Sequence, residues 1–283
     1  MIKIQNIEEY YDLLKQLKET CGRFITNSYL SVAELERYIK LDRLYCLKQE
    51  FGFVFLCDEE KYYRLLYWLK AGSTLSISSS EKPIAVRTIY RENNKREELV
   101  SLEEELQRRG FQKEYSAFEM CVPLEAKDNI SRQNKVFLRM LQKGKFYIAD
   151  MRPEDIDKMH VLREDKDFHI YNFPYKTQDE YFHEIANNQY ISVFNENDEM
   201  CACIYTDILE SYVTGDGICV EDKYKGTYGL GAALMCHVLN MALNEQDKRY
   251  VSWCETENHN SIKFHNSIGF VNTGKVSDEW ILK

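Results

Sequence analysis

The stretch that decides the fold is EDKYKGTYGLGAALMCHVLN, residues 221–240. It places Gly226, Gly229 and Gly231 at the entry of an apolar helix, directly behind two lysines. Glycine adopts positive φ angles without strain and lets a ligand approach the main chain closely. A helix N-terminus also presents unpaired N–H groups and the positive end of the helix dipole, which together suit a phosphate. The stretch therefore predicts a phosphate-binding turn, and the alternative is a glycine-rich turn that binds nothing.

Two common nucleotide-binding loops fit this stretch badly. The Gly-Lys-[Ser/Thr] ending of a Walker-type loop is missing. The preceding segment reads as a β-hairpin and not as the first strand of a βαβ unit, which argues against a dinucleotide loop.

The surrounding residues predict an α/β fold with a mixed sheet. Residues 146–283 read as β-α-α-β-β-β-α-β-α-β, with turn and cap residues between the elements. Pro153 suits the first turn of the first helix, and Thr177 suits the N-cap of the second. A polar turn at 195–198 joins two strands, and the strand YVTGDGICV at 212–220 leads into the glycine loop.

This order and two motifs resemble the GNAT family of acetyl-CoA-dependent N-acyltransferases. The first motif is the family's Arg/Gln-x-x-Gly-x-Gly/Ala loop at the helix entry; here the loop is one residue longer, and Lys225 stands near the place of the Arg. The second is Asn-x-x-Ser/Ala-x-x-x-Tyr/His-x-x-x-Gly-Phe, and the resemblance covers about residues 146–283. The residues that match the second motif are Asn258, Ser261, His265, Gly269 and Phe270.

The resemblance implies acetyl-CoA (coenzyme A) as the cofactor. The strand before the loop is then expected to pair with the pantetheine arm, and the loop to hold the diphosphate. Asn258 and Ser261 are expected near the cofactor arm, with helix capping as a compatible role. The implied cofactor-binding residues are Ile218, Cys219, Val220, Lys225, Gly226, Thr227, Tyr228, Gly229, Leu230, Gly231, Ala232, Asn258 and Ser261.

Acetyl transfer to an amine requires a neutral amine, a donor for the oxyanion and a proton for the leaving thiolate. By the resemblance, His265 stands where the family often has the Tyr that supplies this proton; a packed helix histidine is the alternative. Asp216 is the first candidate for the general base. Glu210, Glu255 and Glu257 are further candidates, and exposed carboxylates are the alternative reading for all four.

Two cysteines lie on strands that flank the expected cleft, Cys219 and Cys254. No partner at a suitable spacing marks either as an acyl-carrying nucleophile, so direct attack by the amine is expected. His237 on the cofactor helix is expected to be structural.

The acceptor is expected to be the primary amine of a small molecule. The stretch DFHIYNFPYKTQDEYFHEI at 167–185 is a candidate acceptor wall, with core packing or contact with the N-terminal domain as the alternative. Residues 146–283 hold 12 Lys+Arg against 24 Asp+Glu, or −12, which favours a cationic acceptor; a merely solvated acidic surface is the alternative. The aromatic wall residues are Phe168, His169, Tyr171, Phe173 and Tyr175.

The first half reads as a second α/β domain. The predicted division is 1–129, a connecting helix at 130–145 that ends near Gly144, and the GNAT-like domain at 146–283. Gly110-Phe111 and Gly269-Phe270 each end a helix, which indicates an ancient duplication or simply the preference of glycine for this position. Because the first half has no glycine loop, a GNAT-like copy there would be degenerate, in a layout similar to tandem GNAT enzymes.

Composition excludes several classes of protein. Hydrophobic residues make up 44% of the 283-residue chain, but no run approaches ~18 apolar residues, so no membrane partner is expected. The net charge of −9 and the acidic second half argue against nucleic acid as a partner. The nine cysteines lack C-x-x-C spacing, which predicts reduced thiols, a cytoplasmic protein and no metal site.

The sequence therefore predicts an acyl-CoA-dependent N-acetyltransferase. One alternative is a non-catalytic acyl-CoA sensor or scaffold, which the altered loop and the missing Tyr favour. Another is a binding module for a different phosphate ligand. The sequence does not determine the oligomeric state.

Overall fold

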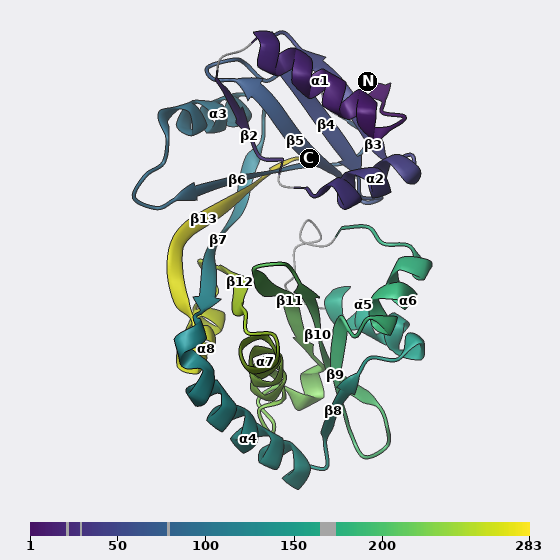
Figure 1. Ribbon diagram of the computed structural model, residues 1–283, viewed down its shortest axis with the longest axis vertical. Coiled ribbons are helices and arrows are strands. Elements are labelled where there is room, and N and C mark those ends of the chain that lie inside the picture. Colours follow the sequence, from purple (N-terminus) through teal and green to yellow (C-terminus); the bar gives the residue numbers. More distant parts are fainter. Residues whose placement is uncertain (21–22, 29, 78–79, 165–173) are drawn as a thin grey trace. The chain divides into compact units, whose positions relative to one another are not determined.

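A computed structural model describes residues 1–20, 23–28, 30–77, 80–164 and 174–283 (Figure 1). The chain forms two compact units, described as far as these ranges allow. The first consists of Met1–Ala117, Phe173–Tyr175 and Gly274–Lys283, and the second of Phe118–Asn172 and Lys176–Thr273. These bounds differ from the predicted division at 129 and 146, because the strands β7 (Gln112–Val122) and β13 (Val271–Leu282) each run from one unit into the other.

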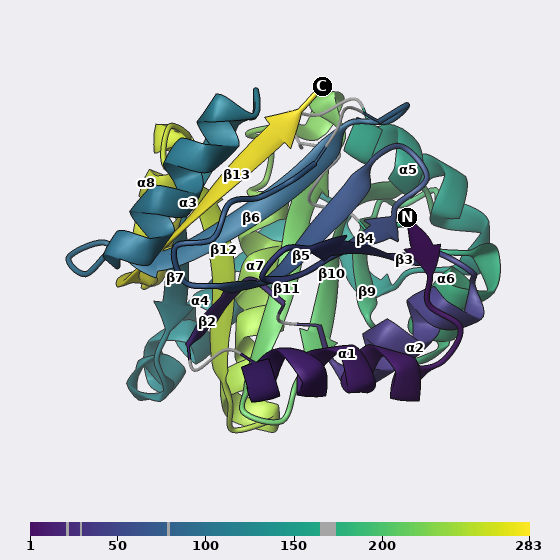
Figure 2. The ribbon, with the colours of Figure 1, turned by 90° about the horizontal axis from the view of Figure 1, so that it is seen from above.

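The first unit is a mixed sheet in which the strands follow the order β1-β3-β4-β5-β6-β13, with β2 paired to β5. Figure 2 shows α1 and α2 together on one side of this sheet and α3 on the other. Its elements are β1 (Ile2–Lys3), α1 (Ile7–Thr20), β2 (Phe24–Thr26), α2 (Val32–Lys40), β3 (Leu44–Gln49), β4 (Gly52–Asp58), β5 (Tyr63–Lys70), β6 (Ile84–Arg91) and α3 (Glu97–Arg108).

Strand β4 explains why helices cover both faces. Successive side chains of a strand point to opposite faces. Phe53 and Phe55 pack into the core that α1 and α2 cover, whereas Val54 and Leu56 pack into the core of α3. A strand that is apolar at every position must be buried on both sides.

The second unit has the strand order β7-β12-β11-β10-β9-β8. Thr177 caps α6 with a complete capping box, as predicted. The elements are α4 (Lys127–Lys143), β8 (Tyr147–Asp150), α5 (Ile156–Glu164), α6 (Gln178–Ala186), β9 (Tyr190–Phe194), β10 (Met200–Ile208), β11 (Tyr212–Val220), α7 (Leu230–Asn240), β12 (Arg249–Glu255) and α8 (His259–Ile268). Short 3₁₀ turns lie at Leu124–Ala126, Pro153–Asp155 and Asp222–Tyr224, and a π-helical turn, Met241–Glu245, follows α7.

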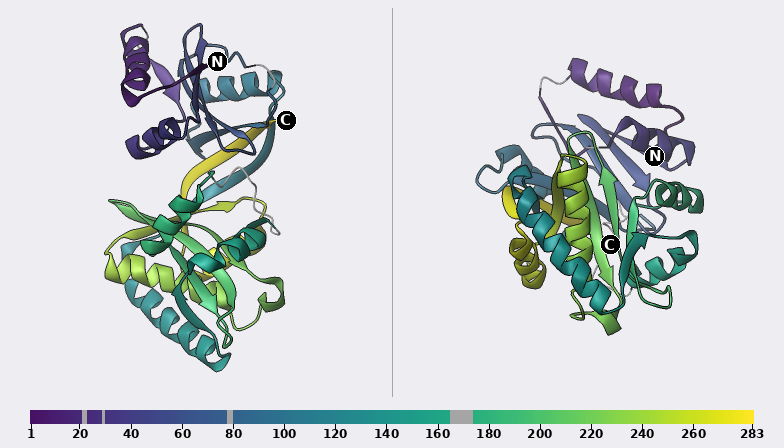
Figure 3. Two further views of the ribbon diagram at one scale, coloured as in Figure 1. Left: turned by 90° about the vertical axis from the view of Figure 1, so that its right-hand side faces the viewer. Right: turned by 60° about the horizontal axis from the view of Figure 1, so that its bottom comes forward.

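Helix α4 does not act as a free connector between the units, which corrects the linker expected at 130–145. It belongs to the second unit, and Ile130 and Leu141 are buried in the same core as α7. Figure 3 (right) shows α4 alongside α7. Because α4 covers the side of α7 that faces away from the sheet, α7 is apolar almost all round its circumference.

The two units repeat one topology. In the second unit, β11 pairs in parallel with β12 and antiparallel with β10. In the first unit, β5 pairs in parallel with β6 and antiparallel with β4. The connection between β11 and β12 contains the glycine loop and α7. The connection between β5 and β6, residues 71–83, has no helix in its described part. As far as the structure describes it, the first unit thus repeats this topology without the helix that follows the glycine loop.

Candidate active site

The candidate site of the second unit begins where two parallel strands diverge. Strands β11 and β12 pair only over residues 212–214 and 249–251. Strand β11 continues to Val220 and stays paired to β10 on its other side. Among the described residues, no strand pairs with β11 at 216–220 on the β12 side. This open edge suits an extended ligand that adds to the sheet as a strand would.

A β-bulge lies at the same place. Cys203 of β10 stands opposite Cys219, but Tyr205 stands opposite Asp216, so β11 has one residue more than β10 in this stretch. Gly217 within it has φ +53°, a left-handed conformation that glycine adopts readily. Because a bulge increases twist and re-aims nearby groups, it turns the main chain that follows it at the open edge. Of the residues predicted to bind the cofactor arm, Ile218 lies in this bulge, and Cys219 and Val220 follow it.

Three left-handed residues shape the loop before α7. The φ angles are +72° at Gly226, +51° at Tyr228 and +64° at Gly229. A non-glycine residue rarely adopts this conformation. The Tyr228 ring is held against Phe146, with 5.5 Å between ring centroids. Gly144 makes room for that contact, since a Cβ added there would lie 2.8 Å from the Tyr228 ring.

The N–H groups at the start of α7 fall into two sets. Thr227 donates to the carbonyl of Tyr224 at 3.0 Å, and Leu230 donates to that of Thr227 at 3.4 Å. These two predicted phosphate donors therefore have partners inside the loop. A second set has no acceptor in the described chain and remains for an anion at the positive end of the helix dipole. Its members are Tyr228, Gly229, Gly231 and Ala232.

The two lysines of the loop pair with neighbouring carboxylates. Lys225 Nζ lies 3.0 Å from Asp222, and Lys223 Nζ lies 2.8 Å from Glu221. The hydrogen bond to Glu221 raises the pKa of Lys223, which keeps this side chain charged at neutral pH. Exposed ion pairs contribute little stability, so a phosphate competes with these carboxylates at small cost.

The second motif builds the start of α8. Asn258 is the N-cap, and its Oδ1 accepts the N–H of Ser261 at 2.9 Å. The Ser261 Oγ in turn accepts the Cys254 thiol of β12 at 3.2 Å. The capping role of Asn258 is present in the structure, whereas the roles of Asn258 and Ser261 toward the cofactor stay predictions.

His265 is buried, with 7% of its surface exposed, and packs edge-on against Phe270 at 4.7 Å between ring centroids. Its Nδ1 lies 2.7 Å from the carbonyl oxygen of Ser261. A carbonyl only accepts, so Nδ1 carries the hydrogen and the neutral ring has its lone pair at Nε2. Burial lowers the pKa of His265, although the bond to Ser261 opposes this. The ring therefore has no free N–H for a thiolate when it is neutral, and the acid role stays a prediction.

The base candidates are less defined. The main chain of Asp216 lies in β11 opposite Tyr205, but its side chain lies outside the described part of the structure. Glu210 and Glu257 are exposed, and Glu255 is half-buried. Nothing in these positions distinguishes one carboxylate as the base.

The cysteines near the cleft are poor nucleophiles. Cys219 and Cys254 are almost fully buried. Burial raises the pKa of Cys254, which keeps it as a thiol at neutral pH, and only the thiolate attacks readily. His237 is half-buried on α7 with a pKa lowered by burial, which agrees with a structural role.

The predicted acceptor wall is described only in part. Phe168, His169, Tyr171 and Phe173 lie outside the described residues. Tyr175 belongs to the first unit, where its ring lies 3.7 Å from the Arg43 guanidinium and its N–H donates to Glu59 at 2.8 Å. For Tyr175, the alternative of a contact with the N-terminal domain is therefore correct.

Sequence reasoning missed the supports of the loop. Phe146 and Gly144 lie about eighty residues before Tyr228, and no local pattern links them. A signal for the bulge was available, because Gly217 is a glycine inside a strand, a common mark of a bulge.

The described residues contain neither a candidate metal cluster nor a helix that could span a membrane. No group of three or more His, Cys, Asp or Glu side chains could hold a metal ion there. No described helix combines the length and apolar character that a bilayer crossing requires.

Comparison with known proteins agrees with this geometry. Residues 156–270 match the family model of the acetyltransferase (GNAT) family. A tandem GNAT protein from the clavulanic acid biosynthesis pathway has a similar structure, with 10% identity, 99% of this chain and 97% of that chain covered, and a TM-score of 0.58. A GNAT-family acetyltransferase from Colwellia psychrerythraea has 10% identity, 99% and 98% coverage and a TM-score of 0.55. No curated protein matches the sequence.

The open edge of β11, the left-handed loop and the α8 motif all lie within residues 156–270, the part of the second unit that matches the GNAT family model. The similarities to solved structures extend over both units and establish the fold of a tandem GNAT protein, with the first unit as the GNAT-like copy.

Proposed function

We propose that the protein transfers an acetyl group from acetyl-CoA to the primary amine of a small molecule by direct attack. The observation that carries the proposal is the open edge of β11 at 216–220, which leads directly to the N–H groups at the start of α7 that have no acceptor among the described residues. An extended arm with a diphosphate at one end matches this combination of a strand edge and an anion site.

The residues present fit acetyl-CoA. The edge at 218–220 would hold the pantetheine arm, and the N–H groups of Tyr228, Gly229, Gly231 and Ala232 the diphosphate. Bound there, acetyl-CoA supplies an acetyl thioester.

The chemistry that remains for the chain is proton transfer. A C–N bond forms as the C–S bond breaks, so a base must take the ammonium proton and an acid must protonate the thiolate. Asp216 is the proposed base. His265 is the proposed acid, and it can serve only when protonated at Nε2, because Nδ1 donates to Ser261.

The experiment is calorimetry with acetyl-CoA, followed by a thiol-release screen against a library of amines. We expect binding and acceptor-dependent release of CoA. The variant His265→Asn keeps a donor near the Ser261 carbonyl, since the Asn Nδ2 replaces Nδ1, but it cannot protonate a thiolate. A loss of about 100-fold or more in kcat supports the acid role. Absence of binding at millimolar acetyl-CoA refutes the proposal.

A second candidate function is acyl-CoA binding without catalysis. The hydrogen bond from His265 to Ser261 and the lowered pKa of His265 favour it, because both leave the site without a ready acid at neutral pH. Tight acetyl-CoA binding with slow release of CoA that neither the amines nor His265→Asn alters would support this candidate over the first.

We also propose that the acceptor is cationic. The support is the charge of −12 in residues 146–283, since an acidic surface raises the local concentration of cations. Polyamines and neutral amines of similar size should then differ in kcat/KM, and the difference should shrink as salt rises. Equal values that do not change with salt would exclude this preference.

A further inference from the structure

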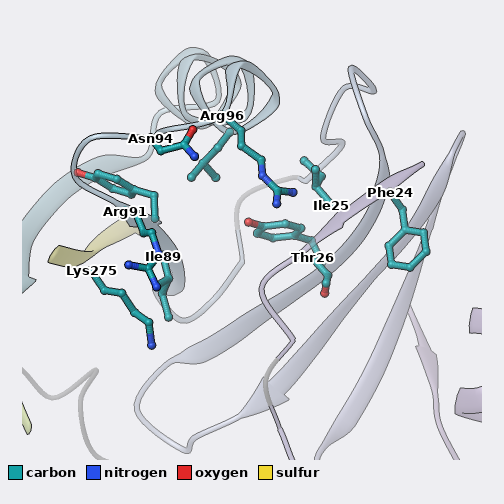
Figure 4. Close-up of a pocket in the computed structure, with 11 residues that line it drawn as sticks. Phe24, Ile25, Thr26, Ile89, Arg91, Asn94, Arg96 and Lys275 are labelled. Atoms are coloured by element: carbon teal, nitrogen blue, oxygen red, sulfur yellow. The ribbon is translucent and has the colours of Figure 1, made fainter. Parts of the chain in front are cut away.

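The first unit contains a pocket of about 510 Å³ (Figure 4). It opens where β5 and β6 diverge, because these strands pair in parallel only from Tyr63 and Ile84 to Leu65 and Val86. The divergence of β11 and β12 in the second unit has the same topology. The pocket is therefore the counterpart, in the first unit, of the site described above.

In this counterpart, another segment of the chain occupies the edge of β5 where an extended ligand would pair. Strand β2 pairs with the edge of β5, with Ile25 opposite Leu69 and Thr26 opposite Trp68. The next residue, Asn27, is buried and bridges the diverging strands. Its Nδ2 donates to the carbonyls of Leu65 at 3.0 Å and Arg87 at 3.1 Å, and its Oδ1 accepts the N–H of Tyr67 at 2.7 Å. β2 and Asn27 therefore occupy the edge of β5 with which a pantetheine arm would pair.

Three cationic side chains line the remaining pocket, at positions where a positive charge is energetically unfavourable. Arg91 of β6 stands directly opposite Lys275 of β13, and like charges at such a position destabilise a sheet. Arg96 is the N-cap of α3 and makes no side-chain capping bond. A cation there faces the positive end of the helix dipole. Figure 4 shows Arg96 on one side of the pocket, and Arg91 and Lys275 near each other on another side.

The other lining residues define the rest of the ligand. None of the described residues that line the pocket is acidic. Ile25, Ile89 and Leu99 supply apolar surface, and Asn94 supplies an amide beside the cations. The volume falls in the range of small-molecule sites, which combine an apolar lining with a few placed polar groups. An anion bound in the pocket would offset this concentration of positive charge.

We propose that this pocket binds a small organic anion, a carboxylate or phosphate on a short apolar or aromatic body, and that it does not bind CoA. The three cations hold the anionic group, and the apolar surface holds the body. The proposal is independent of the acetyltransferase activity proposed for the second unit.

The test is calorimetry on the full chain with hexanoate and phenyl phosphate as probes, and with hexanamide and phenol as neutral analogues. We expect at least one anionic probe to bind at least tenfold more tightly than its neutral analogue, and to weaken with salt. The two anions also distinguish a carboxylate from a phosphate ligand. Equal binding of anionic and neutral probes, or no binding of any probe at 10 mM, would overturn the proposal.

Variants locate the site. Arg91 and Arg96 are exposed, so Arg91→Gln/Arg96→Gln should fold normally and bind the probe at least tenfold more weakly. Lys18→Gln, an exposed lysine of α1 outside the pocket, should bind it like the unchanged protein. Lys223→Gln/Lys225→Gln tests the loop of the second unit. Loss of probe binding in that variant but not in the arginine variant, or displacement of the probe by CoA, would refute the assignment.

Discussion

At the scale of single residues, a neighbour four residues away determines which nitrogen of the neutral His265 ring carries the hydrogen. The Ser261 carbonyl takes the hydrogen of Nδ1, and Phe270 and Phe264 pack against the ring. The sequence places a histidine at this position of the motif, and both a proton-donating role and a packing role are compatible with it. It could not show that the N–H is already used, because that depends on the rotamer within α8.

Protonation of His265 should destabilise the fold. Its pKa is lowered in the folded state, so the unfolded chain binds the proton more readily near pH 6, and the stabilisation present at pH 7.5 is lost as the pH falls through the folded pKa. The loss of melting temperature between pH 7.5 and 5 should therefore be smaller in His265→Asn than in the unchanged protein. Since one pKa unit corresponds to about 1.4 kcal/mol, calorimetry at several pH values can resolve the effect. The same substitution at an exposed position, His259→Asn, is the matched control.

The fit of Tyr228 over Gly144 predicts a remote effect on the loop. In Gly144→Ala the new Cβ would lie 2.8 Å from the ring, so Tyr228 must move and take the loop with it. Overpacking of this kind costs about 1–3 kcal/mol. If the strain is relieved by moving the loop, affinity for acetyl-CoA should fall about five- to a hundredfold, as measured by calorimetry. The neighbouring exposed residue provides the control Lys143→Ala, which should bind normally; unchanged affinity in Gly144→Ala would show that the loop adapts.

At the scale of elements, local rules explain most of the fold. The capping box of Thr177 starts α6, and Gly144 and Gly269 stand at the C-caps of α4 and α8, where the sequence predicts helix ends. The pairing of β2 with β5 and the bulge at Gly217 were not predicted. A three-residue strand has too short a pattern to recognise, and a bulge is defined only by its partner strand.

The start of α7 should depend on glycine more than the loop before it does. Gly229 and Gly226 are both left-handed, so alanine at either position costs roughly 1–2 kcal/mol. A Cβ on Gly229 would also lie 3.3 Å from Phe137 of α4, whereas a Cβ on Gly226 would meet open space. Urea unfolding should therefore show a larger loss of stability for Gly229→Ala than for Gly226→Ala. Equal losses would mean that the packing of α7 on α4 does not depend on this contact.

At the scale of the whole molecule, the units share strands in a way that the order of elements along the chain does not reveal. The last ten residues, 274–283, belong to the first unit, where β13 pairs with β6 from Lys275 opposite Arg91 to Leu282 opposite Ile84. The sequence predicted a closing strand for the second half and could not specify its partner. Pairing between strands so far apart in the sequence follows from the closure of the sheet and not from local pattern.

The pairing of β13 with β6 predicts which unit a substitution near the C-terminus destabilises. Trp280 is buried in the core of the first unit, and its Nε1 donates to Thr88 at 3.4 Å. Trp280→Ala should lower the stability of that unit by about 3–5 kcal/mol. Hydrogen exchange should then lose protection in β6 and α3 while β9 and β10 keep theirs. Val271→Ala, at an exposed position of the same strand, should change little; loss of protection centred on β9 and β10 would contradict the division into units.

The sequence by itself determined the type of nearly every element, the glycine loop and its absence from the first half, and the α8 motif. These features depend on residues within a few positions of one another, whose spacing sets helix and strand periodicity and capping. Only the tertiary structure decided that β11 has an open edge, that β2 and Asn27 close the corresponding edge of β5, and that Tyr228 rests on Phe146. Those features depend on contacts between distant segments, which exist only after the chain has folded and which no local spacing encodes.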